Sequence, residues 1–176
     1  MKRKDFLKTS SALVAGSFLP PISYQQMHPS KTTRKNWAGN YTYRAENLHE
    51  PQTVDEIPDL VKNIQLHKPL GSRHCFNNIA DSPLNQISTR HLNQVKEINK
   101  DDRTITVEAG IRYGDFAPEL HQQGLALHNL ASLPHISVAG ACVTGTHGSG
   151  VNNGNLSTAV RAFEFVTPDG EVVALH

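Results

Sequence analysis

Cysteine, aromatic residues, net charge and long apolar runs are all scarce in this chain of 176 residues. The two cysteines, Cys75 and Cys142, cannot build a disulfide framework, and no C-x-x-C pair is present for a thiolate zinc site. Lys and Arg total 17 against 16 Asp and Glu, and this net charge of +1 argues against nucleic acid as a partner. Charged residues at 19%, with no repetitive tract, argue against a disordered chain or a coiled coil.

The remaining composition is that of a globular protein. With 38% hydrophobic residues, the chain is long enough for one domain with a core and an appendage, but short for two domains. Histidine stands out with ten residues. His91, His121 and His128 do not have the spacing of a metal motif such as H-E-x-x-H, so we expect no metal site.

Residues 1–22 have the pattern of an export signal. A basic start is followed by an apolar stretch at 12–19, far shorter than the roughly 20 residues of a membrane-spanning helix, and by two prolines. Residues 3–8 resemble the twin-arginine motif R-R-x-F-L-K, with Lys4 in place of the second arginine; a Sec-type signal is the alternative. We expect an exported protein, periplasmic or membrane-associated, with any membrane association made through this segment.

The remainder of the chain divides into a linker and a domain. Residues 23–35 are polar and turn-rich, which predicts a linker, and the folded domain is expected to span residues 36–176. The chain ends at His176 directly after a predicted strand, so we expect this domain to continue in a longer protein.

Local patterns predict a mixture of helices and short strands, an α+β fold. Thr53 is placed to cap a helix whose apolar residues run from Val54 to Ile64 at helical spacing. A second helix is predicted over 113–123, with Gly124 as its stop. Strands are predicted at 84–88, 95–98, 104–108, 125–127, 162–167 and 171–175, with hairpin turns at 99–102 and 168–170.

Two glycine-bearing loops carry the chemical signal. The first, at 70–77, follows a short strand and offers small residues whose N–H groups can approach a pyrophosphate, with Arg73 adding charge. It is neither a P-loop nor a Rossmann G-x-G-x-x-G turn, so the usual nucleotide-binding interpretations fail. The second, at 132–150, is rich in small and hydroxyl residues that let backbone lie against a flat or anionic ligand.

These segments together resemble the FAD-linked oxidases of the vanillyl-alcohol oxidase type. The runs GSRHCFN at 71–77, GIRYGD at 110–115, NLASLPHISVAG at 129–140 and TGTHGSG at 144–150 occur in the order found in that family. The similarity covers residues 36–176 and is strongest to the alditol (xylitol) oxidases, whose near relatives are the aldonolactone oxidases.

The resemblance implies a PCMH-type FAD-binding domain of two small α/β subdomains, incomplete at its C-terminal end, where a cap domain is absent. It also implies that His74 is bonded covalently to the flavin 8α-methyl carbon, as the single linkage to FAD. A neutral imidazole held beside that methyl group by a rigid loop is suited to this bond. The family commonly has Gly or Ser where this chain has Arg73, and Ser where it has Cys75. We expect these two differences to affect how the loop packs against the pyrophosphate and how efficiently the flavin is linked.

Further FAD contacts are implied by the same resemblance, whereas the catalytic base is expected beyond residue 176. For Ser137 and Thr144 the alternative to an FAD contact is a hydroxyl that satisfies nearby backbone. For His135 and His147 we expect a histidine that orders its loop in preference to a direct catalytic role. The positions implied to bind FAD are His74, Leu70, Gly71, Ser72, Arg73, Cys75, Ser132, Ser137, Gly140, Thr144, Gly145, Thr146 and His147.

The expected function is therefore an FAD-dependent oxidase. It takes a hydride from a CH–OH group of an alditol such as xylitol or sorbitol, with O2 as acceptor and H2O2 as product. The nearest alternative is an aldonolactone oxidase or dehydrogenase that acts on gulono- or arabinono-lactone. Two other classes remain open: a catalytically incomplete FAD-binding module, and a metal-dependent hydrolase built on the many histidines.

Overall fold

The computed structural model describes residues 33–176. The predicted export signal at 1–22 and most of the predicted linker at 23–35 lie outside the described residues. Within the described residues, none of the helices combines the length and the hydrophobicity needed to cross a membrane. The mixed helix and strand architecture predicted from the sequence is confirmed.

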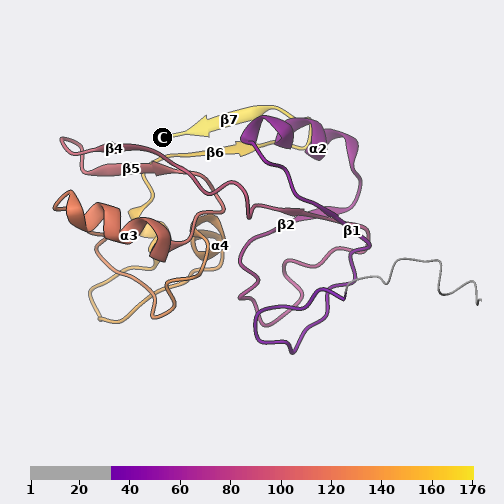
Figure 1. The fold of residues 1–176 in the computed structure, drawn as a ribbon, viewed down its shortest axis with the longest axis horizontal. Helices are drawn as coiled ribbons and strands as arrows, with labels where there is room; N and C mark the ends of the chain where they lie inside the picture. Colours follow the sequence, from indigo (N-terminus) through magenta and orange to yellow (C-terminus); the bar gives the residue numbers. More distant parts are fainter. Residues whose placement is uncertain (1–32) are drawn as a thin grey trace, which may run out of the picture. The chain divides into compact units, whose positions relative to one another are not determined.

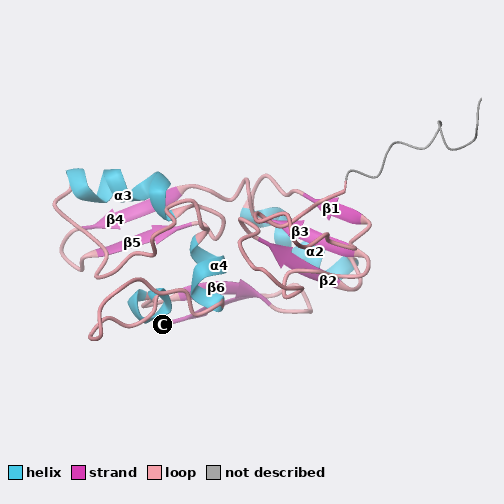
Figure 2. Cartoon of the chain, turned by 90° about the horizontal axis from the view of Figure 1, so that it is seen from below, coloured by secondary structure: helices cyan, strands magenta, loops and turns pink. Residues whose placement is uncertain are grey.

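A three-stranded parallel sheet carries the first loop of interest (Figure 1). Figure 1 labels its outer strands β1 (Asn47–His49) and β2 (His67–Leu70). Strand β3 (Asn85–Ser88) lies between them, as Figure 2 shows. Helix α2 (Ile57–Asn63) makes the crossover between β1 and β2. All four residues of the central strand β3 are buried.

The predicted cap at Thr53 is confirmed, but the residues directly after it form a 3-10 turn, and the α-helix begins only at Ile57. The Thr53 side chain and the Glu56 carboxylate form a capping box, with Glu56 Oε1 accepting from Thr53 N at 3.1 Å. The short 3-10 helix η2 (Val54–Glu56) precedes α2, and Pro58 lies in the first turn of α2, where a missing N–H costs nothing.

A second group of elements surrounds the main hydrophobic core (Figure 2). The antiparallel pair β4 (Val95–Asn99) and β5 (Thr104–Val107) packs with α3 (Tyr113–Gln122), α4 (Val138–Val143) and the 3-10 helix η3 (Leu156–Ala159). The predicted hairpin and the predicted helix over 113–123 are thereby confirmed, and Gly124 ends the helix with φ of +74°. The buried residues of this core are Ile111, Tyr113, Phe116, Leu120, Ile136, Ala141 and Leu156.

The last two strands form a separate hairpin. Strands β6 (Phe163–Val166) and β7 (Val172–Leu175) pair antiparallel, as predicted around the turn at 168–170. Gly170 adopts φ of +79° in this turn, a conformation that favours glycine. Strand β6 also contacts α2.

Two local predictions are wrong. Residues 125–127 form no strand, because Leu125 and Leu127 pack half-buried against the core instead of pairing with a neighbouring strand. The segment 132–150, predicted as a loop, contains α4. Its small residues give no amphipathic pattern, so the helix depends on contacts made elsewhere in the fold.

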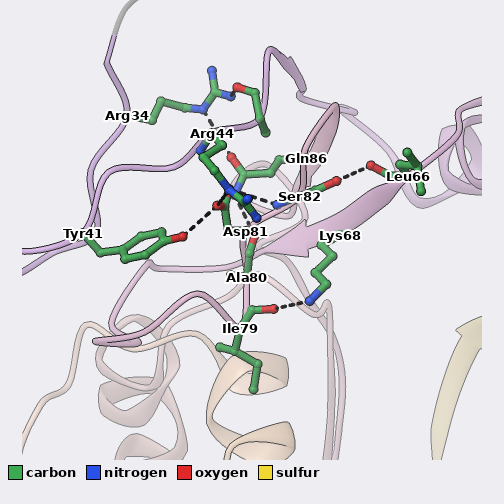
Figure 3. A network of polar contacts seen from close by, with 11 residues as sticks. Arg34, Tyr41, Arg44, Leu66, Lys68, Ile79, Ala80, Asp81, Ser82 and Gln86 are labelled. Carbon is green, nitrogen blue, oxygen red and sulfur yellow. Dashed lines mark hydrogen bonds and ion pairs between the residues drawn. The ribbon is translucent and has the colours of Figure 1, made fainter.

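The buried Asp81 carboxylate joins the N-terminal segment to the sheet (Figure 3). Its Oδ2 accepts hydrogen bonds from Tyr41 Oη and Arg44 Nε, both at 2.8 Å. Its Oδ1 accepts from the backbone N–H groups of Arg44 and Ser82, both at 2.9 Å. Burial raises the pKa of Asp81, but the hydrogen bonds from Arg44 and Tyr41 lower it by more, so the net pKa lies below the ordinary 3.8.

Replacing this carboxylate tests its role in stability. We expect Asp81→Asn to lower the free energy of unfolding at pH 7 by about 2–3 kcal/mol, because an amide NH2 cannot accept from the Arg44 guanidinium. Because the folded-state pKa is lowered, the wild-type advantage is present above pH 3.8 and is lost as the pH falls through the folded pKa. Urea unfolding between pH 7 and pH 3 measures both effects.

The matched control is Asp101→Asn, at an exposed position in the turn between β4 and β5. It should leave stability within about 0.5 kcal/mol of wild type. An Asp81→Asn deficit that stays constant down to pH 3 would show that the carboxylate charge is not its cause.

Candidate functional site

Two serines join the loops that the sequence singled out. Ser72 lies in the loop after β2, and Ser137 is the N-cap residue of α4. Ser137 N donates to Ser72 Oγ at 3.0 Å, and Ser72 N donates to Ser137 Oγ at 3.4 Å. This reciprocal pair, the Ser72–Ser137 joint, connects positions 65 residues apart in the chain.

Glycines make room for the joint. A Cβ atom on Gly71 would lie 2.5 Å from Ser137 Oγ, and one on Gly140 would lie 2.8 Å from the same atom. Ser137 is only 2% exposed, and moving its hydroxyl away would break the hydrogen bond that it accepts from Ser72 N. The close approach of the two loops therefore requires glycine at both positions.

Backbone hydrogen bonds hold the chain before α4 in place. Tyr113 N donates to Ile136 O at 3.2 Å, Gly114 N to Pro134 O at 2.7 Å, and Val138 N to Ile111 O at 2.9 Å. The segment that precedes α4 is thus paired with the start of α3. These bonds explain why a sequence without amphipathic pattern is ordered here.

His74, the predicted attachment point, is half-buried beside the joint. Its Nδ1 lies 3.0 Å from Ser72 Oγ, and its Nε2 is buried without a hydrogen-bond partner among residues 33–176. Burial lowers the pKa of His74 below 6.5, and charge on His135 and Arg112 lowers it further. The imidazole is therefore neutral at pH 7, the form that can act as a nucleophile.

Two aromatic side chains that sequence reasoning did not assign to the site lie against His74. The Trp37 ring stacks on it with centroids 5.1 Å apart and an interplanar angle of 26°. The His135 ring lies 4.6 Å from His74 and 5.8 Å from Trp37. Trp37 N also donates to Arg73 O at 2.8 Å, so this residue contacts the loop through its backbone as well. No local signal around residue 37 pointed to this contact.

The other predicted residues of the first loop differ in exposure. Leu70 is buried at the end of β2, Cys75 is half-buried, and burial raises the pKa of its thiol. Arg73 is exposed and adopts φ of +65°, a conformation that disfavours side chains. A glycine would adopt this conformation without steric cost.

Predicted residues of the second loop interact chiefly with one another. Thr144 Oγ1 donates to Gly140 O at 2.8 Å and lies 3.2 Å from Thr146 Oγ1. Gly145, between the two threonines, has φ of +65°. Thr146 N donates to Ala141 O at 3.1 Å, and Ala141 N donates to Ser137 O at 2.9 Å, so backbone hydrogen bonds connect this group to the Ser72–Ser137 joint. The remaining predicted contacts, Ser132 and His147, are both exposed.

The residues present fit the expected flavin. The buried Nε2 atoms of His74 and His135 are unpaired among the described residues, and buried polar atoms of this kind normally have a partner in the working protein. A flavin bonded to His74 would engage one of these rings, and the small residues beside it leave the backbone accessible to a ligand. No group of three or more His, Cys, Asp or Glu in residues 33–176 is arranged to hold a metal ion.

Known proteins that are similar to this chain bind FAD or are named as oxidases. Residues 45–176 match the family described as FAD binding domain. An alditol oxidase from Streptomyces sp. (strain IKD472 / FERM P-14339) is 45% identical over 147 residues, covering 82% of this chain and 35% of that enzyme. L-Gulonolactone oxidase of Mus musculus is 32% identical over 143 residues, covering 79% of this chain and 32% of that enzyme. The chain thus spans about a third of the length of these curated relatives.

A solved structure shows the same fold. The crystal structure of cholesterol oxidase from B. sterolicum superposes with a TM-score of 0.73 and 19% sequence identity. The match covers 89% of this chain and 34% of that chain. The predicted fold class is confirmed at this level.

The close contact between Gly71 and the Ser137 hydroxyl can be tested with a double-mutant cycle. We expect Gly71→Ala to destabilise the protein by about 1–3 kcal/mol, because its Cβ would overlap Ser137 Oγ. In the double variant with Ser137→Ala, most of this cost should disappear, because the nearest remaining atom is Ser137 Cβ at 3.7 Å. A double-mutant cycle from urea unfolding measures the coupling.

Gly140→Ala provides a second cycle against the same hydroxyl, and Ser137→Ala should rescue it in the same way. Strict additivity in both cycles would contradict the packing described for the joint.

Proposed function

Because the chain belongs to the FAD binding domain family, we propose that the whole protein is an FAD-dependent oxidase acting on CH–OH groups of alditols. Residues 36–176 supply the cofactor-binding part, with His74 as the covalent attachment point. No catalytic acid or base is assigned within these residues.

The neutral, confined imidazole of His74 is the observation that supports this proposal most directly. FAD, when bound, would supply the two-electron acceptor for the hydride of the substrate's carbinol carbon. The role of His74 is to hold the flavin in place. Its own ring is held by Ser72 Oγ beside Nδ1 and by Trp37, which stacks on one face of the ring. An anchor fixed in this way keeps the flavin in one orientation, which lowers the entropic part of the barrier for a bound substrate.

Similarity favours an alditol over a lactone as substrate. The alditol oxidase is 45% identical to this chain, against 32% for the L-gulonolactone oxidase, over nearly the same share of the sequence. We propose xylitol or sorbitol as the type of substrate and O2 as the acceptor, giving H2O2. Ala131, a small half-buried residue in the second loop, is compatible with access of O2. An aldonolactone is the second candidate, favoured by the gulonolactone oxidase match.

Flavin attachment tests the role of His74. We expect the full-length protein to retain yellow, fluorescent flavin after acid precipitation and washing, and His74→Ala to lose it, because the only proposed covalent bond is removed. The matched control is His121→Ala, an exposed position on α3, which should retain flavin like wild type. Flavin released from wild type as well would remove His74 as the attachment point.

Substrate oxidation tests the proposed activity. With the same preparation, H2O2 release should be higher with xylitol or sorbitol than with L-gulono-1,4-lactone at equal concentration. The reverse order would identify the lactone as the substrate class. Flavin reduction without H2O2 release would identify a dehydrogenase that uses another acceptor.

A further inference from the structure

His135 lies beside His74 with nothing in the described protein to explain its confinement. Its ring is tilted by 50° to that of His74, with centroids 4.6 Å apart, and Trp37 packs against both rings. Its Nε2 is buried and has no hydrogen-bond partner among residues 33–176. The two imidazoles are in contact, and each has a buried Nε2 that is bonded neither to the other ring nor to another described group. A base that stands this close to His74 is placed to take up a proton when His74 reacts.

Bonding His74 to a flavin releases protons. The reaction breaks one C–H bond of the 8α-methyl group and the N–H bond of the neutral imidazole, and it forms one C–N bond. Two protons and two electrons are left over; the electrons pass through the flavin ring to dioxygen, which leaves with two protons as H2O2. A nearby base that accepts the proton leaving the His74 N–H bond accelerates such a step by about 10²–10⁴-fold.

We propose that His135 is this proton acceptor for the covalent attachment of flavin at His74, a role that rests on the function proposed above. Trp37 holds the two imidazoles together by packing against both rings. His135 thus acts while the cofactor is being attached, separately from the hydride transfer of the finished enzyme.

The other polar side chains around His74 are unsuited to the role. Arg73 and Arg112 influence His74 as cations, which have no lone pair to offer. Ser72 Oγ already accepts from Ser137 N. Burial raises the pKa of the Cys75 thiol, so it remains protonated and is not a base. Imidazole, in contrast, accepts and releases protons near neutral pH.

The experiment follows flavin attachment as a rate. Full-length protein from flavin-limited cells is mixed with FAD, and two quantities are measured over time: total bound flavin after desalting, and flavin retained after acid precipitation. We expect His135→Gln to bind FAD like wild type but to attach it about a hundredfold more slowly. The matched control His121→Gln, on the exposed face of α3, should attach FAD at the wild-type rate.

A second variant separates proton transfer from packing. In His135→Ala, added imidazole should restore much of the attachment rate, whereas it should have no effect on wild type. A purely structural role for His135 would not produce this rescue.

The possible failures are distinguishable. Attachment in His135→Gln at the wild-type rate would overturn the inference and leave the proposed function intact. Loss of all FAD binding in both His135 variants would also overturn it, since the side chain would then support the fold or the binding step. Acid-stable flavin in His74→Ala, or none in wild type, would instead refute the attachment site itself.

Discussion

The reciprocal hydrogen bonds between Ser72 and Ser137 are the constraint on which the arrangement of the site depends. One serine follows a strand of the parallel sheet and the other is the N-cap of a helix packed on the main core, so the joint connects the sheet to that core. The same Ser72 hydroxyl lies 3.0 Å from His74 Nδ1, so the position of the imidazole follows from the joint. Gly71 and Gly140 are required because each lies where a side chain would displace the Ser137 hydroxyl.

The loop that carries His74 is also held from its other side, by the N-terminal segment. Asn36 Nδ2 donates to Cys75 O at 3.0 Å, and Trp37 N donates to Arg73 O at 2.8 Å. Asp81 anchors this segment to the sheet through Tyr41 and Arg44. Held at both sides, the loop can keep Arg73 at φ of +65°, a conformation that costs about 1–2 kcal/mol for a residue with a side chain.

Features set by neighbouring residues could be predicted from the sequence, whereas features set by distant contacts could not. The Thr53 capping box, the Gly124 helix end and the turn before Gly170 each involve a few consecutive residues. Helix α4 and the missing strand at 125–127 depend on which segments lie alongside them, and local pattern does not report this. At the site, similarity to known oxidases pointed to His74, but Trp37 lies 37 positions earlier in the chain and reaches it only through the fold.

The unpaired imidazole nitrogens link cofactor binding to stability. A buried polar atom without a partner costs about 1–3 kcal/mol, and His74 and His135 each carry one in the protein alone. A ligand that engages these rings removes part of that cost and stabilises the folded state relative to the unfolded chain. The cluster is therefore least stable before the flavin binds. The proposed attachment of flavin needs a neutral, desolvated nucleophile beside a second imidazole at that same stage. The same burial that destabilises the empty site keeps His74 unprotonated, which is the form that the proposed bond to flavin requires.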